Sequence, residues 1–265
     1  MTDDALRAAA LRWREEGRAA VVVEVAATRG SVPRETGTRM LVSADAVLGT
    51  IGGGHLELSA IADARRQLAE GGAAHGQHIA LGPTLGQCCG GALDLRFVPL
   101  ADDDPTHWRA EAPRFELQLY GAGHVGRAIV RLLAELPCRV SWIDEREDEF
   151  PPDLLPPHIQ RLCVEPVEAE VAAAPPGCFY LVLTHSHDLD LALAQAILAR
   201  GDFGFFGLIG SATKRARFEN RLLARGLPAE RVARMVCPIG LPGIGGKEPQ
   251  MIAIAAVAQL LQQAR

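Results

Sequence analysis

The fold of the second half of the chain is decided by one run of residues, Glu116-Leu117-Gln118-Leu119-Tyr120-Gly121-Ala122-Gly123-His124-Val125-Gly126. Residues 116–120 predict a β-strand, and the glycine pattern G-x-G-x-x-G follows directly. Apolar residues then recur at helical spacing as far as Pro137, which is expected to end the helix. A strand, a glycine-rich turn and a helix in this order are typical of units that bind dinucleotides. We therefore predict a Rossmann-like fold for this half of the chain.

Each glycine of this turn has an expected role. Gly121 permits the tight turn, Gly123 lets a ligand approach the backbone, and Gly126 lets the helix pack on the sheet. The free N–H groups at the start of the helix, near His124, can receive a phosphate. Asp144 ends the next expected strand about 20 residues further on, where NAD sites hold a ribose hydroxyl with an acidic residue. The same turn is also compatible with the phosphate of another ligand, or with no ligand.

Short apolar stretches alternate with helical ones through the rest of this half, which favours a parallel sheet. The expected strands are 116–120, 139–143, 160–164, 178–184, 205–209 and 234–237. A helix is expected after each strand except the second, because residues 145–152 have no helical pattern.

The first half of the chain has the pattern of a small α+β unit. Helices are expected at 3–16 and 55–70, and strands at 20–26, 40–43, 47–51, 77–81 and 93–98. An acidic stretch with prolines follows and reads as a connection between domains. The expected fold class is α/β, with a small N-terminal α+β domain at 1–100, a linker at 101–113 and a Rossmann-like parallel-sheet domain at 114–265.

The composition is that of a folded globular protein, since 48% of the 265 residues are hydrophobic and 22% are charged. The net charge of −5 argues against nucleic acid as the main partner. No apolar run approaches the roughly 20 residues that a membrane helix needs, and the acidic start of the chain is unlike a signal peptide. We expect a cytoplasmic protein that does not contact membranes and whose six cysteines are reduced.

Two adjacent cysteines lie in the glycine-rich stretch Leu85-Gly86-Gln87-Cys88-Cys89-Gly90-Gly91. Adjacent cysteines rarely form a structural zinc site, which spaces its ligands by two to four residues. A thiol pair between glycines suits a soft metal, sulfur transfer or disulfide exchange. The alternative is that both are small buried hydrophobic residues. The remaining cysteines fall on expected strands and are interpreted as core residues: Cys138, Cys163, Cys178 and Cys237.

Two further loops of the first half carry candidate binding residues. The loop 28–37 contains Arg29 and Arg34, whose guanidinium groups match phosphates and other oxyanions, and Arg39 is expected to join this positive patch. The turn Gly52-Gly53-Gly54 opens a helix, with His55 and Glu57 as the nearest polar side chains. The alternatives are a solvated surface loop and a tight connection without a ligand.

In the second half, His185 and His187 follow a strand at its C-terminal end, where ligands bind in open α/β sheets. They are compatible with a metal site, but a hydrogen-bonding role is favoured over metal ligation. The basic helix start with Lys214, Arg215 and Arg217 and the glycine- and proline-rich loop 239–249 are expected to rim the same crevice.

Six motifs in this order resemble the xanthine dehydrogenase accessory proteins of the XdhC/CoxI family, over nearly the whole chain. They are Gly30-Ser31-x-Pro33-Arg34, Gly52-Gly53-Gly54-x-Leu56-Glu57, Gln87-Cys88-Cys89-Gly90-Gly91, Gly121–Gly126, Leu208-Ile209-Gly210-Ser211 and Cys237-Pro238-Ile239-Gly240. The resemblance implies an accessory protein, not an enzyme, that binds the molybdenum cofactor and helps to load its sulfurated form into xanthine dehydrogenase. It also implies the dehydrogenase apoprotein and a cysteine desulfurase as partners, and a homodimer.

For such a protein we expect Cys88 and Cys89 to contact the molybdenum directly, because thiolates suit a soft metal. The other residues expected to bind the cofactor are Gln87, Gly52, Gly53, Gly54, Glu57, Arg29, Arg34, Gly121, Gly123, His124, Gly126, Asp144, His185 and His187. Two other functions stay open from the residues alone. One is an NAD(P)-dependent oxidoreductase that uses the Rossmann-like domain, and the other is a thiol–disulfide or sulfur-carrier protein that uses the cysteine pair.

Overall fold

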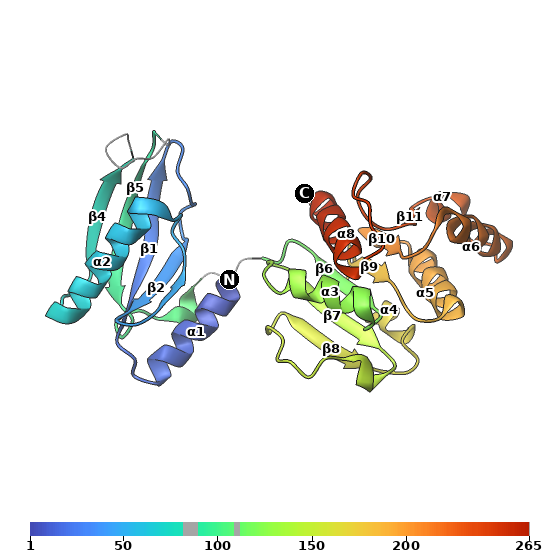
Figure 1. Cartoon of the computed structure of the whole chain (residues 1–265), viewed down its shortest axis with the longest axis horizontal. Coiled ribbons are helices and arrows are strands. Elements are labelled where there is room, and N and C mark those ends of the chain that lie inside the picture. Colours follow the sequence, from blue (N-terminus) through green and yellow to red (C-terminus); the bar gives the residue numbers. More distant parts are fainter. Residues whose placement is uncertain (82–89, 109–111, 265) are drawn as a thin grey trace. The chain divides into compact units, whose positions relative to one another are not determined.

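The computed structural model describes residues 1–81, 90–108 and 112–264. The chain forms two compact units, Met1–Glu111 and Ala112–Arg265. Figure 1 colours the N-terminal unit blue to green and the C-terminal unit green to red. The first unit is built on an antiparallel sheet and the second on a parallel one, so the predicted fold class is confirmed.

The N-terminal unit contains a five-stranded antiparallel sheet in the order β3-β2-β1-β5-β4. The strands are β1 (Ala20–Arg29), β2 (Arg39–Ser43), β3 (Val47–Gly49), β4 (His75–Ala80) and β5 (Ala92–Pro99). The expected hairpin is present, with Val42 of β2 opposite Val47 of β3. The central strand β1 is rich in valine, and its side chains alternate between the two faces of the sheet.

Two helices, α1 (Asp3–Glu15) and α2 (Gly54–Glu70), pack on opposite faces of this sheet. Val21 and Val23 of β1 belong to the core that includes Ala60 of α2. Val22 lies on the other face, in the core that includes Trp13 of α1. Both helices are needed because a valine-rich strand exposes apolar side chains on each of its faces.

The stretch that the sequence marks as a linker is partly packed on the N-terminal unit. A single 3-10 turn, η2 (Pro105–His107), leads to Trp108, whose side chain is buried against the core of α1. The indole Nε1 atom of Trp108 donates a hydrogen bond to Oδ2 of Asp103 at 2.8 Å. The sequence does not predict this packing, because the stretch is acidic and contains prolines. A single aromatic ring supplies most of the apolar area that it buries.

The C-terminal unit contains a six-stranded parallel sheet in the order β11-β10-β9-β6-β7-β8. The strands are β6 (Glu116–Tyr120), β7 (Arg139–Asp144), β8 (Ile159–Cys163), β9 (Phe179–Val182), β10 (Phe205–Leu208) and β11 (Met235–Val236). The first strand in sequence, β6, lies in the middle, and the chain builds outward from it in one direction and then in the other. Such sheets bind ligands outside the carboxyl ends of the strands, at the point where the order reverses.

Helices cover both faces of the parallel sheet. Two of them, α3 (His124–Leu133) and α8 (Pro249–Gln263), share one core with the sheet. The opposite core includes side chains of α4 (Ala169–Ala173), α5 (His187–Arg200), α6 (Ala212–Ala224) and α7 (Ala229–Val232). Figure 1 shows α3 and α8 on the same side of the strands. The connection after β7 contains a 3-10 turn, η3 (Glu147–Glu149), in agreement with its non-helical pattern.

Cys138, Cys178 and Cys237 are buried, as expected for core residues. Cys163 is exposed, so its assignment to the core is wrong. It is the last residue of β8, the edge strand of the sheet, where fewer neighbours cover a side chain. Among the described residues, no helix combines the length and the apolar character that crossing a bilayer requires.

Candidate functional site

The glycine-rich turn of the C-terminal unit is shaped by close backbone packing. Gly121 has a φ of +115°, and a Cβ atom there would lie 2.3 Å from the carbonyl oxygen of Leu183. A Cβ atom on Gly126 would lie 2.1 Å from the carbonyl oxygen of Gly121. Real Cβ atoms do not approach other atoms so closely, so these two glycines are required by the fold itself.

Gly123 is different, because the described residues leave open space beside it. It precedes α3 with a φ of −69°, which any residue can adopt, and a Cβ atom there would meet nothing within 4 Å. His124 follows as the first residue of α3 and is exposed. A side chain would fit at position 123, so the open space in front of the helix start is available to a ligand.

Asp144, the expected ribose-binding acid, is already fully hydrogen-bonded. Its Oδ2 atom accepts a bond from the backbone N–H of Ala122 at 2.7 Å and another from Nη2 of Arg146 at 2.9 Å. Its Oδ1 atom accepts bonds from the backbone N–H and the Nε atom of Arg146, at 3.0 and 2.9 Å. A carboxylate has about four lone-pair positions, so none is left for a ribose hydroxyl in this arrangement.

The electrostatics of Asp144 agree with this structural role. Burial by itself raises the pKa of the carboxyl group, but the hydrogen bonds from Arg146 and from the Ala122 amide outweigh it and hold the pKa below its ordinary value. The network continues outward, because Nη2 of Arg127 lies 2.7 Å from Oε2 of Glu149 and Nε of Arg127 donates to the carbonyl oxygen of Ala122 at 2.9 Å. The turn is thereby fixed to the chain that follows β7.

His185 and His187 lie in one crevice at the carboxyl ends of β9 and β10. The crevice has a volume of about 410 Å³, and Ser211, Lys214 and Arg217 from the start of α6 also line it. His185 Nε2 lies 3.5 Å from Oε1 of Glu145. His187 Nδ1 lies 3.4 Å from Nη2 of Arg217.

The structure thus brings the two histidines together with the basic helix start. The expectation that loop 239–249 also rims this crevice is wrong, because the lining residues come from 184–187 and 209–217. Over residues 1–81, 90–108 and 112–264, no group of three or more His, Cys, Asp or Glu side chains could hold a metal ion. The neighbours of the two histidines in the structure are Glu145, beside His185, and Arg217, beside His187.

Lys214, one of the residues that line this crevice, forms a buried ion pair with Asp190. Nζ of Lys214 lies 2.5 Å from Oδ2 of Asp190, and the two side chains are 9% and 1% exposed. The other carboxylate oxygen, Oδ1, accepts bonds from the hydroxyl and the backbone N–H of Thr184, at 2.7 and 3.1 Å. Sequence analysis missed this pair, although an aspartate among the leucines of α5 is a signal that a buried partner is needed.

In the N-terminal unit, the loop after β1 packs on the expected glycine turn. A Cβ atom on Gly52, where φ is +124°, would lie 2.6 Å from Cβ of Pro33 and 3.6 Å from Cγ of Arg34. Glu57 closes the same turn, because its Oε2 atom accepts bonds from the backbone N–H groups of Ile51 and Gly53, at 3.0 and 3.1 Å, and from the Thr50 hydroxyl. Glu57 therefore occupies two amides that the sequence left free for a ligand.

Gln87, Cys88 and Cys89 lie outside the described residues, but the residues on either side of their segment are described. Leu81 N–H donates to the carbonyl oxygen of Gly91 at 2.8 Å. A Cβ atom on Gly91 would lie 2.4 Å from the carbonyl oxygen of Ser31 and 2.5 Å from that of Arg29. The residues that flank the segment with the two cysteines therefore lie against the loop that carries Arg29, at the end of the sheet where β1 and β4 finish and β5 begins (Figure 1).

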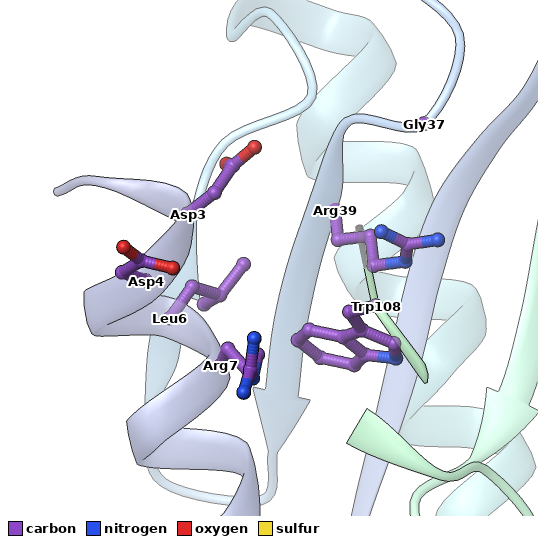
Figure 2. Close-up of a pocket in the computed structure, with 7 residues that line it drawn as sticks. All are labelled: Asp3, Asp4, Leu6, Arg7, Gly37, Arg39 and Trp108. Atoms are coloured by element: carbon purple, nitrogen blue, oxygen red, sulfur yellow. The ribbon is translucent and has the colours of Figure 1, made fainter. Parts of the chain in front are cut away.

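Arg29 and Arg34 are both exposed, and within the described parts of the chain neither has an ion-pair partner. Arg39 does not join them, contrary to expectation. Its Nη2 atom lies 2.5 Å from Oε1 of Glu24, and its guanidinium carbon lies 5.1 Å from the centre of the Trp108 ring. Figure 2 shows Arg39 beside Trp108 in a small pocket that α1 also lines. Arg39 points there because it is on the sheet face that α1 covers, beside Glu24, its partner in the β1–β2 register.

Both units match models of one protein family. The model of the XdhC Rossmann domain matches residues 117–260, and that of the XdhC and CoxI family matches residues 13–79. The chain belongs to the XdhC and CoxI family. This confirms the resemblance drawn from the six motifs, and membership of the XdhC family supports an accessory role over a catalytic one.

Two relatives of this XdhC-family chain bear on its fold. The uncharacterized protein YqeB of Escherichia coli (strain K12) is 32% identical over 262 residues, which are 96% of this chain and 45% of that protein. The chain thus spans less than half the length of this curated relative. A crystal structure described as a xanthine dehydrogenase from Bacillus halodurans is 19% identical and has a TM-score of 0.73, over 99% of this chain and 96% of that one. At this identity the likeness shows a shared fold.

Proposed function

We propose that this XdhC-family protein binds the molybdenum cofactor and delivers it, in sulfurated form, to the apoprotein of a xanthine dehydrogenase. The observation that carries the proposal is the contact of Gly91 with the carbonyl oxygens of Arg29 and Ser31. Through it, the residue that follows Cys88-Cys89-Gly90 in the chain is held beside a loop with two arginines that lack ion-pair partners among the described residues. We expect the thiols of this cysteine pair to act together with the two arginines of the loop.

The residues present fit the chemistry of this group. Its pterin carries a phosphate, and the exposed guanidinium groups of Arg29 and Arg34 match phosphate oxygens as bidentate donors. Gly53 has a φ of +76°, and a Cβ atom there would meet no atom of the described residues within 4 Å, so these residues leave a ligand room to approach the turn. These residues would bind and orient the cofactor, whose molybdenum centre supplies the redox chemistry when it is bound in the dehydrogenase.

The soft metal ligand would be a cysteine thiolate, and the described cysteines are poor candidates. Burial raises the pKa of Cys138 and of Cys178 to about 12, and it also raises the pKa of Cys237. A hydrogen bond with Glu147 raises the pKa of Cys163. A thiolate is the form that binds metals. We therefore assign metal contact to Cys88 and Cys89.

An NAD(P)-dependent oxidoreductase is not favoured by the geometry of the C-terminal unit. The carboxylate that would hold the adenosine ribose has its four acceptor positions filled by Ala122 and Arg146. Sulfur transfer through the cysteine pair is compatible with the proposal, because loading a sulfurated cofactor requires a sulfur donor. A cysteine desulfurase is therefore a proposed partner together with the dehydrogenase, and a homodimer is the proposed assembly.

The test is to produce the full chain together with the cofactor-synthesis machinery and to measure bound molybdenum and pterin after purification. We expect both in the wild-type protein, and much less of both in the Cys88→Ser/Cys89→Ser and Arg29→Gln/Arg34→Gln variants. Cys163→Ser and Arg131→Gln are matched controls, because both residues are exposed and belong to the other unit. Equal retention by the double-cysteine variant and the Cys163→Ser control would refute the proposal.

Delivery is tested separately by adding loaded protein to xanthine dehydrogenase apoprotein and measuring the recovered hydroxylase activity. The wild-type protein and the Cys163→Ser control are expected to restore activity, whereas the double-cysteine variant should not. If the wild-type protein holds the cofactor but never activates the apoprotein, the role in delivery is wrong and only storage remains.

A further inference from the structure

Cationic and hydrogen-bond-donating groups gather in the crevice where β9 and β10 end. Its lining includes His185, His187, Ser211, Lys214 and Arg217, and none of the residues that line it is an aspartate or a glutamate. Asp190 lies below the surface, where it neutralises Lys214. Among the described residues that line the crevice, the charge without an ion-pair partner is therefore that of Arg217. The nearest carboxylate beside the lining is that of Glu145, whose Oε1 atom lies 3.5 Å from Nε2 of His185.

The start of α6 adds backbone donors to this wall. Ser211 precedes the helix, and its Oγ atom accepts a bond from the backbone N–H of Lys214 at 3.2 Å. The N–H groups of Ala212 and Thr213 in the first turn have no carbonyl of the helix to bond to. Thr213 and Arg217 lie one turn apart on the same face, and both line the crevice. The helix dipole and the guanidinium group therefore attract an anion to the same place.

Lys214 also lines the crevice, but its charge is paired with that of Asp190. Its side chain is 9% exposed, and its Nζ atom donates to Oδ2 of Asp190 at 2.5 Å and to the carbonyl oxygen of Ile209 at 2.9 Å. Thr184 in turn donates two hydrogen bonds to Asp190, so this part of the crevice wall is held in place.

We propose that this crevice of the C-terminal unit is a binding site for a phosphate ester, with the phosphate held between Arg217, His187 and the start of α6. A phosphate group has three acceptor oxygens, so it can accept hydrogen bonds from a guanidinium group, from helix amides and from hydroxyls at the same time. A single carboxylate matches this set of donors less well. The volume of about 410 Å³ exceeds what a bare ion needs and falls in the range of small-molecule sites. Thr184 and His185 line both this crevice and a small cavity beside Gly121, so the crevice lies next to the glycine-rich turn.

This site does not depend on the proposed function, because it uses no cysteine and lies in the C-terminal unit. The phosphate group has two plausible sources, a nucleotide and a pterin phosphate. The two differ in their organic part, so their relative affinities identify the source.

The test is isothermal titration of the full-length protein with inorganic phosphate, with ADP and with a 6-alkylpterin phosphate. We expect saturable binding of at least one ester, and we expect Arg217→Gln to weaken it by about fivefold or more, as the loss of one charge-assisted contact predicts. Arg221→Gln is the matched control. It removes the same charge from the same helix, one turn further on, where the side chain faces Asp188 and does not line the crevice.

Tighter binding of ADP assigns the site to nucleotides, and tighter binding of the pterin phosphate assigns it to pterins. The proposal is overturned if no probe binds at concentrations up to about 5 mM, since phosphate sites of this kind bind more tightly. It is also overturned if Arg217→Gln and Arg221→Gln have equal affinities. The cysteine variants are expected to lose the cofactor but to bind these probes with unchanged affinity. This result would show that the crevice and the site of the N-terminal unit are distinct.

Discussion

The carboxylate of Asp144 accepts a hydrogen bond from the backbone N–H of Ala122 at 2.7 Å, which joins the end of β7 to the glycine-rich turn after β6. Arg146 supplies the remaining donors to this carboxylate. In a dinucleotide site the same position would bind the ribose of the ligand. Here it binds the protein itself, so the residue contributes to the stability of the turn.

Asp144→Asn is therefore expected to destabilise the C-terminal unit by about 1–3 kcal/mol, because buried donors of Arg146 and Ala122 lose a charged acceptor. Urea unfolding at neutral pH measures this change. Asp148→Asn is the control, since Asp148 is exposed on the same connection, and its free energy of unfolding should be unchanged.

The lowered pKa of Asp144 also predicts a dependence of stability on pH. Because the folded-state pKa lies below the unfolded one, the contribution of Asp144 is complete above the ordinary aspartate pKa of about 3.9 and is lost as the pH falls through the folded value. The difference in unfolding free energy between wild type and Asp144→Asn should shrink in acid. A difference that stays constant from neutral pH to strongly acidic pH would contradict this role.

The buried pair of Lys214 and Asp190 makes a second prediction. Lys214→Met and Asp190→Asn each remove or neutralise one member and should cost about 3–5 kcal/mol, because the other is left without its charged partner. The double variant Lys214→Met/Asp190→Leu should recover much of this loss. Arg215→Gln, which breaks a surface pair with Glu219 on the same helix, should cost about 1 kcal/mol or less. Thermal unfolding of the four variants checks the order.

Two glycines of the turn, Gly126 and Gly123, are expected to differ in how much an alanine substitution destabilises the C-terminal unit. Gly126→Ala places a Cβ atom 2.1 Å from the carbonyl oxygen of Gly121 and should destabilise the C-terminal unit by about 2 kcal/mol or more. Gly123→Ala meets open space and should cost about 1 kcal/mol or less. The midpoints of urea unfolding compare the two variants, and equal midpoints would argue against the packing described at Gly126.

In the N-terminal unit, Gly91 and the adjacent Gly90 form a matched pair. A Cβ atom on the buried Gly91 would lie 2.4 Å from the carbonyl oxygen of Ser31, whereas one on the exposed Gly90 would meet no atom of the described residues within 4 Å. Gly91→Ala should reduce both the stability of this unit, by about 2 kcal/mol, and its retention of pterin. Gly90→Ala should change neither. Hydrogen exchange of β1 and β5, together with pterin fluorescence, measures the two effects, and retention of pterin by a destabilised Gly91→Ala variant would count against the proposed site.

Much of the fold was predictable because its signals are local. The valine-rich β1 and the strand–glycine–helix sequence from Glu116 to Gly126 each specify an element by hydrophobic period and backbone freedom, without reference to distant residues. The same holds for the non-helical connection after β7. The burial of Trp108 and the exposure of Cys163 could not be predicted, because burial depends on which part of the fold lies opposite a residue, and residues adjacent in sequence do not show that.

The sequence by itself determined the class of both units, the place of the glycine turn and the family to which the chain belongs. Only the tertiary structure decided which side chains remain available to a ligand. It committed Asp144 to Arg146, Glu57 to the backbone of its own turn and Lys214 to Asp190. It left Arg29 and Arg34 exposed in the loop whose backbone lies against Gly91, which follows the cysteine segment. The reason is physical: a polar group has a small number of hydrogen-bond positions, and the partners that fill them come from parts of the chain that folding brings together.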